Sequence, residues 1–329
     1  MEMCMVKAGE KGFLYEEFKK RNIVAIGWGI GDVKNLTIDE ISDRLREKDD
    51  DNVNRHASTI VRFRDELKKG DCVLSASPLN EKFLIGKITS DYYFSEELIE
   101  EGIDPYSKYN NIRKVKWLCE ISSDELSEST VDYFGHFIQT LSKVRNDDVI
   151  TEILDLYDSV SSWDDESRNV IYFGAPGTGK SYNLEKEKDI LLKDNKNGFE
   201  RVTFHPDYSY ANFVGTYKPR PKKDDDGNKT DDITYEYVPG PFMRTLVEAL
   251  KHPCKPFLLI IEEINRSNVA AVFGDVFQLL DRDNNFESEY PIETSEDMRD
   301  FLHDELKKEC KKIKIPSNMF IWATMNSAD

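Results

Sequence analysis

Residues 169–181 read NVIYFGAPGTGKS, and this stretch decides the fold of the C-terminal half of the chain. From Gly174 to Ser181 it fits the pattern G-x-x-x-x-G-K-[ST] without a mismatch. The apolar residues 170–173 predict a strand that enters the loop, and residues 181–193 predict a helix that leaves it. Glycines in such a loop let backbone N–H groups surround phosphate oxygens, and the helix N-terminus adds a partial positive charge. A chance glycine-rich turn is the alternative.

This loop predicts the binding of a nucleoside triphosphate. The residues expected to cradle the phosphates are Gly174, Ala175, Pro176, Gly177, Thr178, Gly179, Lys180 and Ser181. We expect Lys180 to reach the β- and γ-phosphates and the Ser181 hydroxyl to ligate Mg²⁺. The loop does not distinguish GTP from ATP.

A pair of acids follows the next buried strand. Residues 256–261 read PFLLII and lead into Glu262 and Glu263. We expect Glu262 to hold Mg²⁺ and Glu263 to orient the water that attacks the phosphate. The first of these positions is usually Asp, so the extra methylene of Glu262 changes its reach to the metal. A solvated acidic pair at a strand end is the alternative.

A third apolar strand, predicted over residues 319–325, ends in Asn326. An amide at this place can hydrogen-bond both the attacking water and the γ-phosphate. Lys180, Glu263 and Asn326 are therefore the candidate catalytic residues, provided that the three strand ends meet at one edge of a parallel sheet. A core strand that ends in an Asn turn is the alternative.

In this order, the three motifs resemble an AAA+ ATPase core, and shorter segments between them are similar to the McrB family. The segments are TFHPDYSYANFVG (203–215), EINRSN (263–268), FGD (273–275) and ATMNSAD (323–329). The family motif at the last segment has Thr where this chain has Ser327. The resemblance covers residues 169–329 and implies an α/β AAA+ P-loop core, a parallel sheet with flanking helices.

The McrB family supplies the motor subunit of modification-dependent restriction systems, and the resemblance carries further expectations. It implies ring-shaped self-association with nucleotide at the subunit interfaces, GTP as substrate in the best-known members, DNA with a modified base, and an McrC-like nuclease partner. AAA+ cores continue after this point into a helical lid and arginines that act across the ring. The chain ends at Asp329, so we expect weak or no hydrolysis by this chain alone. Arg266 and Arg282 receive no role.

The N-terminal half has a different texture. Strands are predicted at 23–28, 71–77, 82–88 and 114–121, with helices at 38–48 and 54–69. Thr37 followed by Glu40 predicts a capping box. This mixture predicts a small β-barrel or curled sheet with inserted helices. The segments IGWG (26–29), KGDCV (69–73) and FLIGKI (83–88), with Tyr92 and Tyr93, resemble the PUA-like superfamily that includes EVE and YTH readers.

That second resemblance implies an α+β barrel that holds a flipped base in an aromatic pocket. The candidate pocket walls are Trp28, Tyr93 and Trp117, although aromatic residues of strands more often pack inward. A basic strip on the helix at 54–69 could contact phosphates, but a solvated face is the simpler interpretation. Its members are Arg62, Arg64, Lys68 and Lys69.

We expect three segments: a reader domain over 1–135, a helix (137–160) and linker (161–168), and the P-loop core over 169–329. The polar stretch 219–232 predicts an exposed hairpin tip or loop. The formal net charge is −18, with −7 on residues 1–150 and −11 on the remainder. General clamping of a phosphate backbone is therefore not predicted, and a nucleic-acid contact needs a local patch or a pocket.

No apolar run is long enough for a membrane helix and the N-terminus has no signal sequence, which predicts a cytoplasmic protein. Five histidines and five cysteines show no metal-ligand spacing, so no zinc site is expected. The leading hypothesis is a nucleotide-hydrolysing DNA-recognition and motor subunit of an McrBC-like restriction system. A nucleotide-gated nucleic-acid adaptor without turnover and a MoxR-like AAA+ remodelling chaperone are the alternatives.

Overall fold

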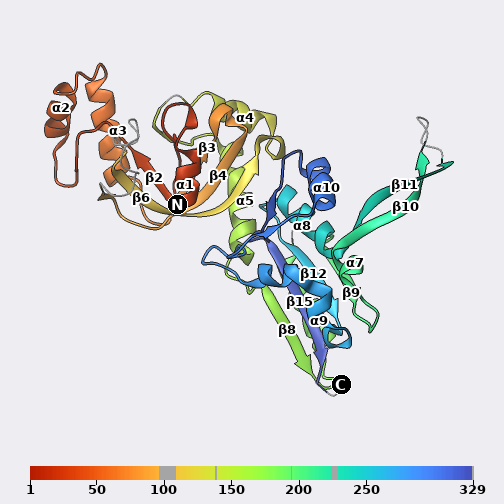
Figure 1. Cartoon of the computed structure of the whole chain (residues 1–329). Coiled ribbons are helices and arrows are strands. Elements are labelled where there is room, and N and C mark those ends of the chain that lie inside the picture. Colours follow the sequence, from red (N-terminus) through yellow and green to blue (C-terminus); the bar gives the residue numbers. More distant parts are fainter. Residues whose placement is uncertain (96–108, 138, 194, 224–228, 328–329) are drawn as a thin grey trace. The chain divides into compact units, whose positions relative to one another are not determined.

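The structure, a computed structural model, describes residues 1–95, 109–137, 139–193, 195–223 and 229–327 (Figure 1). The chain divides into two compact units, Met1–Ser161 and Ser162–Asp329. Each unit has a hydrophobic core of its own. We therefore describe the two units separately.

Unit 1 is built on a mixed sheet. Its strands are β1 (Met3–Val6), β2 (Ile23–Ile26), β3 (Cys72–Ala76), β4 (Lys82–Ile88), β5 (Tyr93–Phe94), β6 (Asn111–Ser122) and β7 (Leu141–Lys143). The order is β2-β6-β4-β3-β1-β7, and β5 also pairs with β6. Among the strand pairs of the described residues in this unit, β1–β3 is parallel and the others are antiparallel. The four strands predicted from the sequence are all present.

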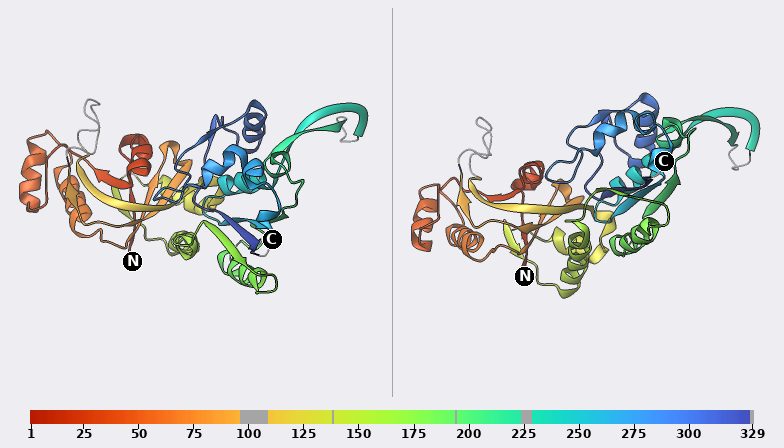
Figure 2. Two further views of the ribbon diagram at one scale, coloured as in Figure 1. Left: turned by 60° about the horizontal axis from the view of Figure 1, so that its bottom comes forward. Right: turned by 90° about the horizontal axis from the view of Figure 1, so that it is seen from below.

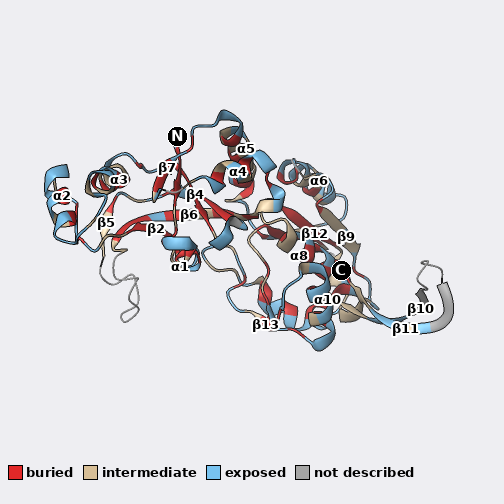
Figure 3. Ribbon diagram, turned by 90° about the horizontal axis from the view of Figure 1, so that it is seen from above, coloured by how far each residue is buried: buried red, intermediate tan, exposed pale blue. Residues whose placement is uncertain are grey.

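Short helices surround this sheet. They are η1 (Glu10–Gly12), α1 (Tyr15–Arg21), α2 (Ile38–Arg46), α3 (Val53–Asp65), η2 (Pro78–Asn80), η4 (Ser123–Glu125), α4 (Glu128–Gly135) and α5 (Asp147–Trp163). The capping box of α2 is present: Thr37 Oγ1 accepts from the Glu40 N–H, and the Glu40 carboxylate accepts from the Thr37 N–H. Figure 3 shows the buried strands of this unit in red beneath helices with exposed outer faces.

The helix expected over 137–160 begins later than predicted, at Asp147. Leu141–Lys143 instead forms β7, which pairs antiparallel with β1. Burial of Leu141 and Val144 suits either a strand or a helix, so their spacing was ambiguous. The expected linker 161–168 is also wrong in part, because Trp163 ends α5 and both Trp163 and Arg168 are buried.

Unit 2 is built on a four-stranded parallel sheet. The strands are β8 (Asn169–Gly174), β9 (Phe199–Thr203), β12 (Phe257–Glu262) and β15 (Met319–Asn326), in the order β8-β15-β12-β9. The central strand β12 reads FLLIIE, and five of its six residues are buried. A continuous apolar run is typical of a parallel strand that is covered on both faces.

Helices and short pairs complete unit 2. The helices are α6 (Lys180–Leu191), α7 (Tyr210–Phe213), α8 (Pro241–Lys251), η5 (Ile264–Arg266), α9 (Val269–Phe273), η6 (Gly274–Leu280) and α10 (Glu296–Leu306), and β13 (Ile292–Glu293) pairs with β14 (Lys312–Ile313). The helix α8 packs on β9, β12 and β15, whereas α6 contacts β8. A hairpin of β10 (Gly215–Lys223) and β11 (Lys229–Pro239) extends away from the sheet, as Figure 2 shows. The expected tip or loop, 219–232, is narrower than predicted because both of its ends lie in these strands, and residues 224–228 lie outside the described residues.

Buried polar side chains fix the N-terminal ends of these strands. Asn318 Nδ2 donates to the carbonyl oxygens of Ala249, His252 and Lys255. The guanidinium of Arg168 lies over the ring of Phe286 at 4.2 Å. These contacts hold the start of β15 in place, and the opposite ends of the same strands are left for the candidate site.

Candidate functional site

The carboxyl ends of the parallel strands bring the predicted site residues to one edge of the sheet. In the strand register, Asn326 at the end of β15 lies opposite Gly174 at the end of β8. Glu262, at the end of β12, lies opposite Thr203 of β9. Ligands of open α/β sheets bind outside the carboxyl ends of the strands, so this edge is the expected place for a site.

The loop 174–181 joins β8 to α6 and has the backbone that its glycines permit. Gly177 and Gly179 have φ of 78° and 82°, a region that residues with a Cβ seldom adopt. The Lys180 ammonium donates to the carbonyl oxygens of Gly174 and Ala175, each at 2.8 Å. Ser181 lies exposed in the first turn of α6. The lysine therefore rests on loop carbonyls that a phosphate ligand can replace.

Glu263 and Asn326 are in direct contact. Asn326 Nδ2 donates to both carboxylate oxygens of Glu263, at 2.6 and 2.8 Å. Arg266 Nε lies 3.4 Å from the same carboxylate. The Ser327 N–H donates to the Gly174 carbonyl, the same oxygen that Lys180 contacts. Lys180, Glu263 and Asn326 are thus joined through one short series of contacts.

Glu263 has an unusual backbone conformation. Its φ of 54° and ψ of 47° are left-handed, and it stands directly before η5. A residue with a Cβ in this region costs about 1 kcal/mol or more, and such residues gather at functional sites. The turn directs the chain away from β12 immediately after Glu262.

Glu262 has two partners that the sequence did not reveal. Arg201 Nη1 donates to Glu262 Oε1 at 2.8 Å, and the Thr324 hydroxyl donates to Glu262 Oε2. Thr324 also accepts from the Glu263 N–H at 3.2 Å, so one hydroxyl contacts both acids. The only sequence signal for Thr324 was its position two residues before Asn326, on the same face of the strand.

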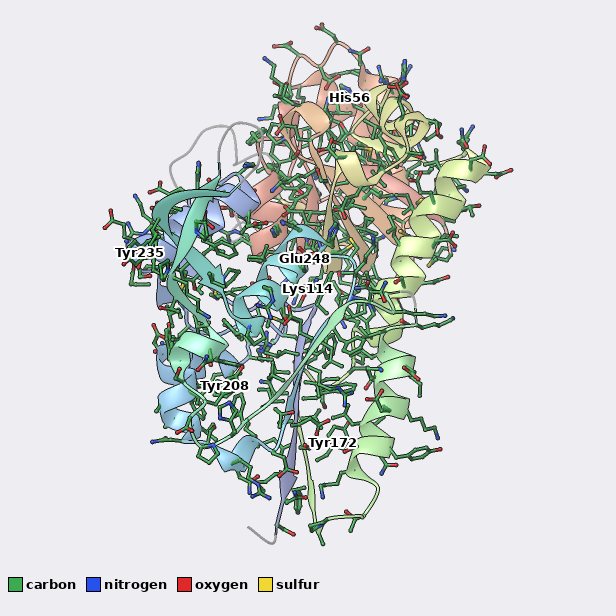
Figure 4. The ribbon with its side chains drawn as sticks, turned by 90° about the vertical axis from the view of Figure 1, so that its right-hand side faces the viewer. His56, Lys114, Tyr172, Tyr208, Tyr235 and Glu248 are labelled. Atoms are coloured by element: carbon green, nitrogen blue, oxygen red, sulfur yellow. The ribbon has the colours of Figure 1, made fainter. Side chains whose placement is uncertain are left out.

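Arg201 also connects the sheet to helix α6. The second terminal nitrogen of its guanidinium group, Nη2, donates to Glu185 of α6. A hydrogen bond from Lys188, with Arg201 nearby, lowers the pKa of Glu185. Tyr172 of β8, labelled in Figure 4, donates from its hydroxyl to Glu187 of the same helix. An isolated Arg within the short strand 199–203 was the available signal, and it was missed.

Asn265 supports the same edge from η5. Its Nδ2 donates to the Asn326 carbonyl at 3.1 Å. Its Oδ1 is buried and has no hydrogen-bond partner among the described residues. Asn265 thus ties η5 to the main chain at the end of β15.

The expected magnesium ligands have suitable chemistry. Mg²⁺ prefers oxygen ligands and keeps several waters, with one or two carboxylates from the protein. The Ser181 hydroxyl and the Glu262 carboxylate supply such oxygens, although Glu262 is also paired with Arg201. Among the described residues, no group of three or more His, Cys, Asp or Glu side chains forms a protein-only metal cage.

The segment 203–215 has a structural role that its motif did not indicate. Phe204 and Phe213 are buried in the core of unit 2, and their rings meet edge to face at 5.7 Å. Phe204 also stacks on Tyr208, at 4.7 Å between centroids. This segment therefore packs α7 against the hydrophobic core of unit 2.

The two arginines without an assigned role differ in environment. Arg266 is about half exposed beside Glu263. Arg282 is buried and donates to the carbonyls of Phe286, Ile315, Pro316 and Met319. Burial, together with the charge of Arg168, lowers the pKa of Arg282 to about 10. Arg282 is thus a structural residue of its own unit.

The candidate aromatic residues of unit 1 each have a different partner. Trp28 packs on His56 of α3, at 5.0 Å between ring centroids. Trp117 donates from Nε1 to the Phe18 carbonyl at 2.8 Å. Burial raises the pKa of Tyr93, which pairs with β6. All three rings pack against the hydrophobic core, and their role as pocket walls stays a prediction.

The basic strip predicted on a helix over 54–69 is divided among several contacts, and α3 ends at Asp65, so Lys68 and Lys69 lie after the helix. Arg62 pairs with Glu66, and Lys69 pairs with Asp91. Arg64 is largely covered and pairs with Asp65. These residues do not form a single solvated face or a single phosphate strip.

Two family models match this chain. The model described as AAA domain (dynein-related subfamily) matches residues 169–329. A domain of unknown function, DUF8426, matches residues 3–141, and the PUA-like resemblance of this part is not confirmed. In the part of the chain that the structure describes, no helix has the length and apolar character needed to cross a membrane.

Two curated proteins are similar in sequence. One is the type II restriction enzyme BsuMI component YdiS of Bacillus subtilis, 50% identical over 178 residues, which are 49% of this chain and 51% of that protein. The other is the type IV methyl-directed restriction enzyme EcoKMcrB subunit of Escherichia coli, 30% identical over 165 residues, which are 49% of this chain and 31% of that protein. The chain thus spans about half or less of the length of these relatives.

Proposed function

We propose that this McrB-like AAA+ protein hydrolyses a nucleoside triphosphate at the edge formed by β8, β15 and β12, as the recognition and motor subunit of a DNA restriction system. The observation that carries the proposal is the contact of the Asn326 amide with the Glu263 carboxylate beside Gly174. A carboxylate and an amide held together next to a phosphate loop are the groups that water attack on a γ-phosphate requires.

The loop residues 174–181 bind the phosphates in this mechanism. The Lys180 ammonium exchanges the Gly174 and Ala175 carbonyls for phosphate oxygens. The exchange keeps the ammonium hydrogen-bonded in both states, so nucleotide binding leaves no donor unsatisfied. Ser181 and Glu262 would hold Mg²⁺, which neutralises phosphate charge when it is bound with the nucleotide.

Glu263 and Asn326 handle the water. The water oxygen forms a bond to the γ-phosphorus, the bond from that phosphorus to the bridging oxygen breaks, and the water proton passes to the Glu263 carboxylate. In this proposal the Asn326 amide orients that carboxylate and, when nucleotide is bound, donates to the γ-phosphate. Thr324 donates to the Glu262 carboxylate and accepts from the Glu263 main-chain N–H, so it holds Glu262 beside the turn at Glu263.

The parts of the proposal that concern DNA and a partner nuclease rest on the names of the curated relatives. Both curated relatives are named as components of restriction enzymes, and one of them as methyl-directed. We assign DNA recognition to unit 1 and nucleotide turnover to unit 2, with the cleavage of DNA left to a separate nuclease subunit. Turnover by the chain alone should be slow and should rise when that subunit and DNA are added.

The test is hydrolysis of GTP and of ATP by wild type and by Glu263→Gln, alone and with the nuclease subunit. We expect the substitution to lower multiple-turnover kcat by about 100-fold or more, with nucleotide affinity within about threefold of wild type. Glu236→Gln, an exposed change on β11, is the matched control. Equal turnover by Glu263→Gln would refute the catalytic assignment, and binding without any turnover would favour the adaptor alternative.

A further inference from the structure

Unit 1 contains a cavity that the proposed reaction does not use. Its volume is about 350 Å³, within the range of small-molecule sites. The lining residues are Lys34, Arg64, Asp65, Leu67, Lys68, Asp91, Tyr92 and Arg113. They come from the loop after β2, the end of α3 and its following turn, the turn before β5, and β6. We call this cavity the basic pocket.

Two arginines make the walls of the basic pocket rigid. Arg113 donates to the carbonyls of Phe63, Ser90 and Arg64, at 2.9, 3.0 and 2.5 Å. Arg64 Nη1 donates to the carbonyls of Val33 and Leu36, at 2.8 and 2.6 Å. The loop that carries Lys34 and the turn before Tyr92 are thereby tied to the end of α3. A site that is fixed before binding loses little conformational entropy when a ligand arrives.

The acids of the basic pocket are already neutralised. Asp65 accepts from Arg64 through both carboxylate oxygens, at 2.7 and 2.6 Å. Asp91 pairs with Lys69 at 2.8 Å. These two pairs carry no net charge, so Lys34, Lys68 and Arg113 are the remaining charges of the lining. Two further carboxylates lie beside the lining, because Asp32 accepts from the Lys34 main-chain N–H and Asp71 from the Lys68 main-chain N–H.

Those three cations lack a carboxylate partner within ion-pair distance among the described residues. Arg113 is only 3% exposed, and its hydrogen-bond acceptors are main-chain carbonyls. Burial lowers the pKa of Arg113, while the charges of Asp91, Asp65 and Asp71 act in the opposite direction. Lys34 and Lys68 are exposed at the rim. With Asp32 and Asp71 counted, the three cations still leave a net positive charge around the cavity, in a chain whose net charge is −18.

We propose that the basic pocket binds a phosphate group, which the cations Lys34, Lys68 and Arg113 neutralise. The Arg113 guanidinium uses three of its five N–H groups on carbonyls and keeps two for an anion. The cavity is larger than one phosphate needs and has room for a nucleotide unit. A DNA strand is the source that we favour, and this choice of source rests on the proposed function, whereas the phosphate site itself does not.

The first test measures DNA binding by the full chain over a range of NaCl concentrations. Lys34→Ala/Lys68→Ala should weaken binding of a labelled duplex about tenfold, and the slope of log Kd against log[NaCl] should fall by about 0.9, the contribution of the one phosphate that the variant no longer neutralises. Lys20→Ala/Lys48→Ala removes the same charge from exposed positions of unit 1 and should leave the slope unchanged. Equal slopes in the two double variants would overturn the DNA assignment.

The second test reports on the two lysines of the pocket directly and compares a free phosphate ligand with DNA. Amine acetylation followed by mass spectrometry should show Lys34 and Lys68 protected by pyrophosphate and by duplex DNA, with Lys20 as the unprotected reference. If the wild type binds no duplex, the proposed function fails, yet protection by pyrophosphate would still uphold the phosphate site and assign it to a free phosphate ligand. If neither probe protects Lys34 and Lys68, the inference is wrong whatever the outcome for DNA.

Discussion

At the scale of single residues, burial and hydrogen-bond partners distinguish two arginines that the sequence alone could not tell apart. Arg266 and Arg282 were two arginines without a role. Arg282 proves to be buried and bonded to four main-chain carbonyls, whereas Arg266 stands half exposed beside Glu263. A residue that acts on a neighbouring molecule must be reachable, so of these two only Arg266 can serve outside its own unit.

This difference predicts opposite effects on stability. Arg282→Leu should lower the free energy of unfolding by about 3 kcal/mol, because four carbonyls lose a charged donor. Arg266→Ala removes an exposed pair and should change it by less than about 0.5 kcal/mol. Urea denaturation of both variants measures this. Similar losses in the two variants would contradict the structural assignment of Arg282.

Arg201 allows a test of how Glu262 becomes available to a metal. Because Arg201 holds one oxygen of Glu262 in this structure, Mg²⁺ must compete with it. Arg201→Met should therefore lower, several-fold, the Mg²⁺ concentration that half-saturates nucleotide binding. Arg244→Met removes an arginine paired with Glu200 and serves as the control. A higher Mg²⁺ requirement in Arg201→Met would mean that Arg201 positions Glu262 for the metal.

At the scale of elements, strong local sequence patterns were sufficient to predict individual strands and helices. The apolar run of β12 and the capping box of α2 predicted their elements to within a residue or two. The loop 174–181 was equally readable, because phosphate binding needs glycines at fixed places. Helix 137–160 was misplaced because Leu141 and Val144 fit two periodicities, and only pairing with β1 decides between them.

The sequence predicted that Glu263 and Asn326 would meet only on the condition that their strands end at one edge of a parallel sheet. Asn326 and Glu263 are 63 residues apart, and their meeting depends on the order β8-β15-β12-β9. Strand order follows from tertiary packing, which the sequence constrains only through fold-level rules. Arg201 and Thr324 became visible only when that order placed them beside Glu262.

The parallel pair β1–β3 predicts a loss of stability at alkaline pH. Burial raises the pKa of Cys4 to about 11 and of Cys72 to about 12, above their usual value of 9.0. The folded state thus retains protons that the unfolded chain releases, so the stabilisation is complete below pH 9 and is lost as pH rises toward 11 and 12.

Between pH 8 and 10, we expect the free energy of unfolding to fall by about 1 kcal/mol for each thiol. Cys4→Ala/Cys72→Ala should show a correspondingly shallower decline in urea titrations over the same range. An identical pH slope in the double variant would show that other groups, such as the buried tyrosines, account for the loss.

At the scale of the whole molecule, the chain combines two compact units with separate cores. Only the second contains the loop, the acids and Asn326, so a nucleotide should act on the two units differently. A ligand at 100 times its Kd stabilises the folded state that binds it by about 2.7 kcal/mol.

Hydrogen exchange read by mass spectrometry checks this expectation. With Mg²⁺ and nucleotide, exchange in β8, β12 and β15 should slow up to about 100-fold, while the strands of unit 1 keep their rates. Lys180→Ala is the control that should abolish the slowing. Equal slowing in both units would show that nucleotide binding is coupled to unit 1.

The left-handed backbone at Glu263 carries a consequence for laboratory evolution. Glycine or asparagine would adopt that backbone conformation with less strain than glutamate. A screen that selects only for thermal stability should therefore repeatedly recover replacements at position 263. If the proposed role of Glu263 is correct, the variants recovered by such a screen would be more stable but would hydrolyse nucleotide more slowly.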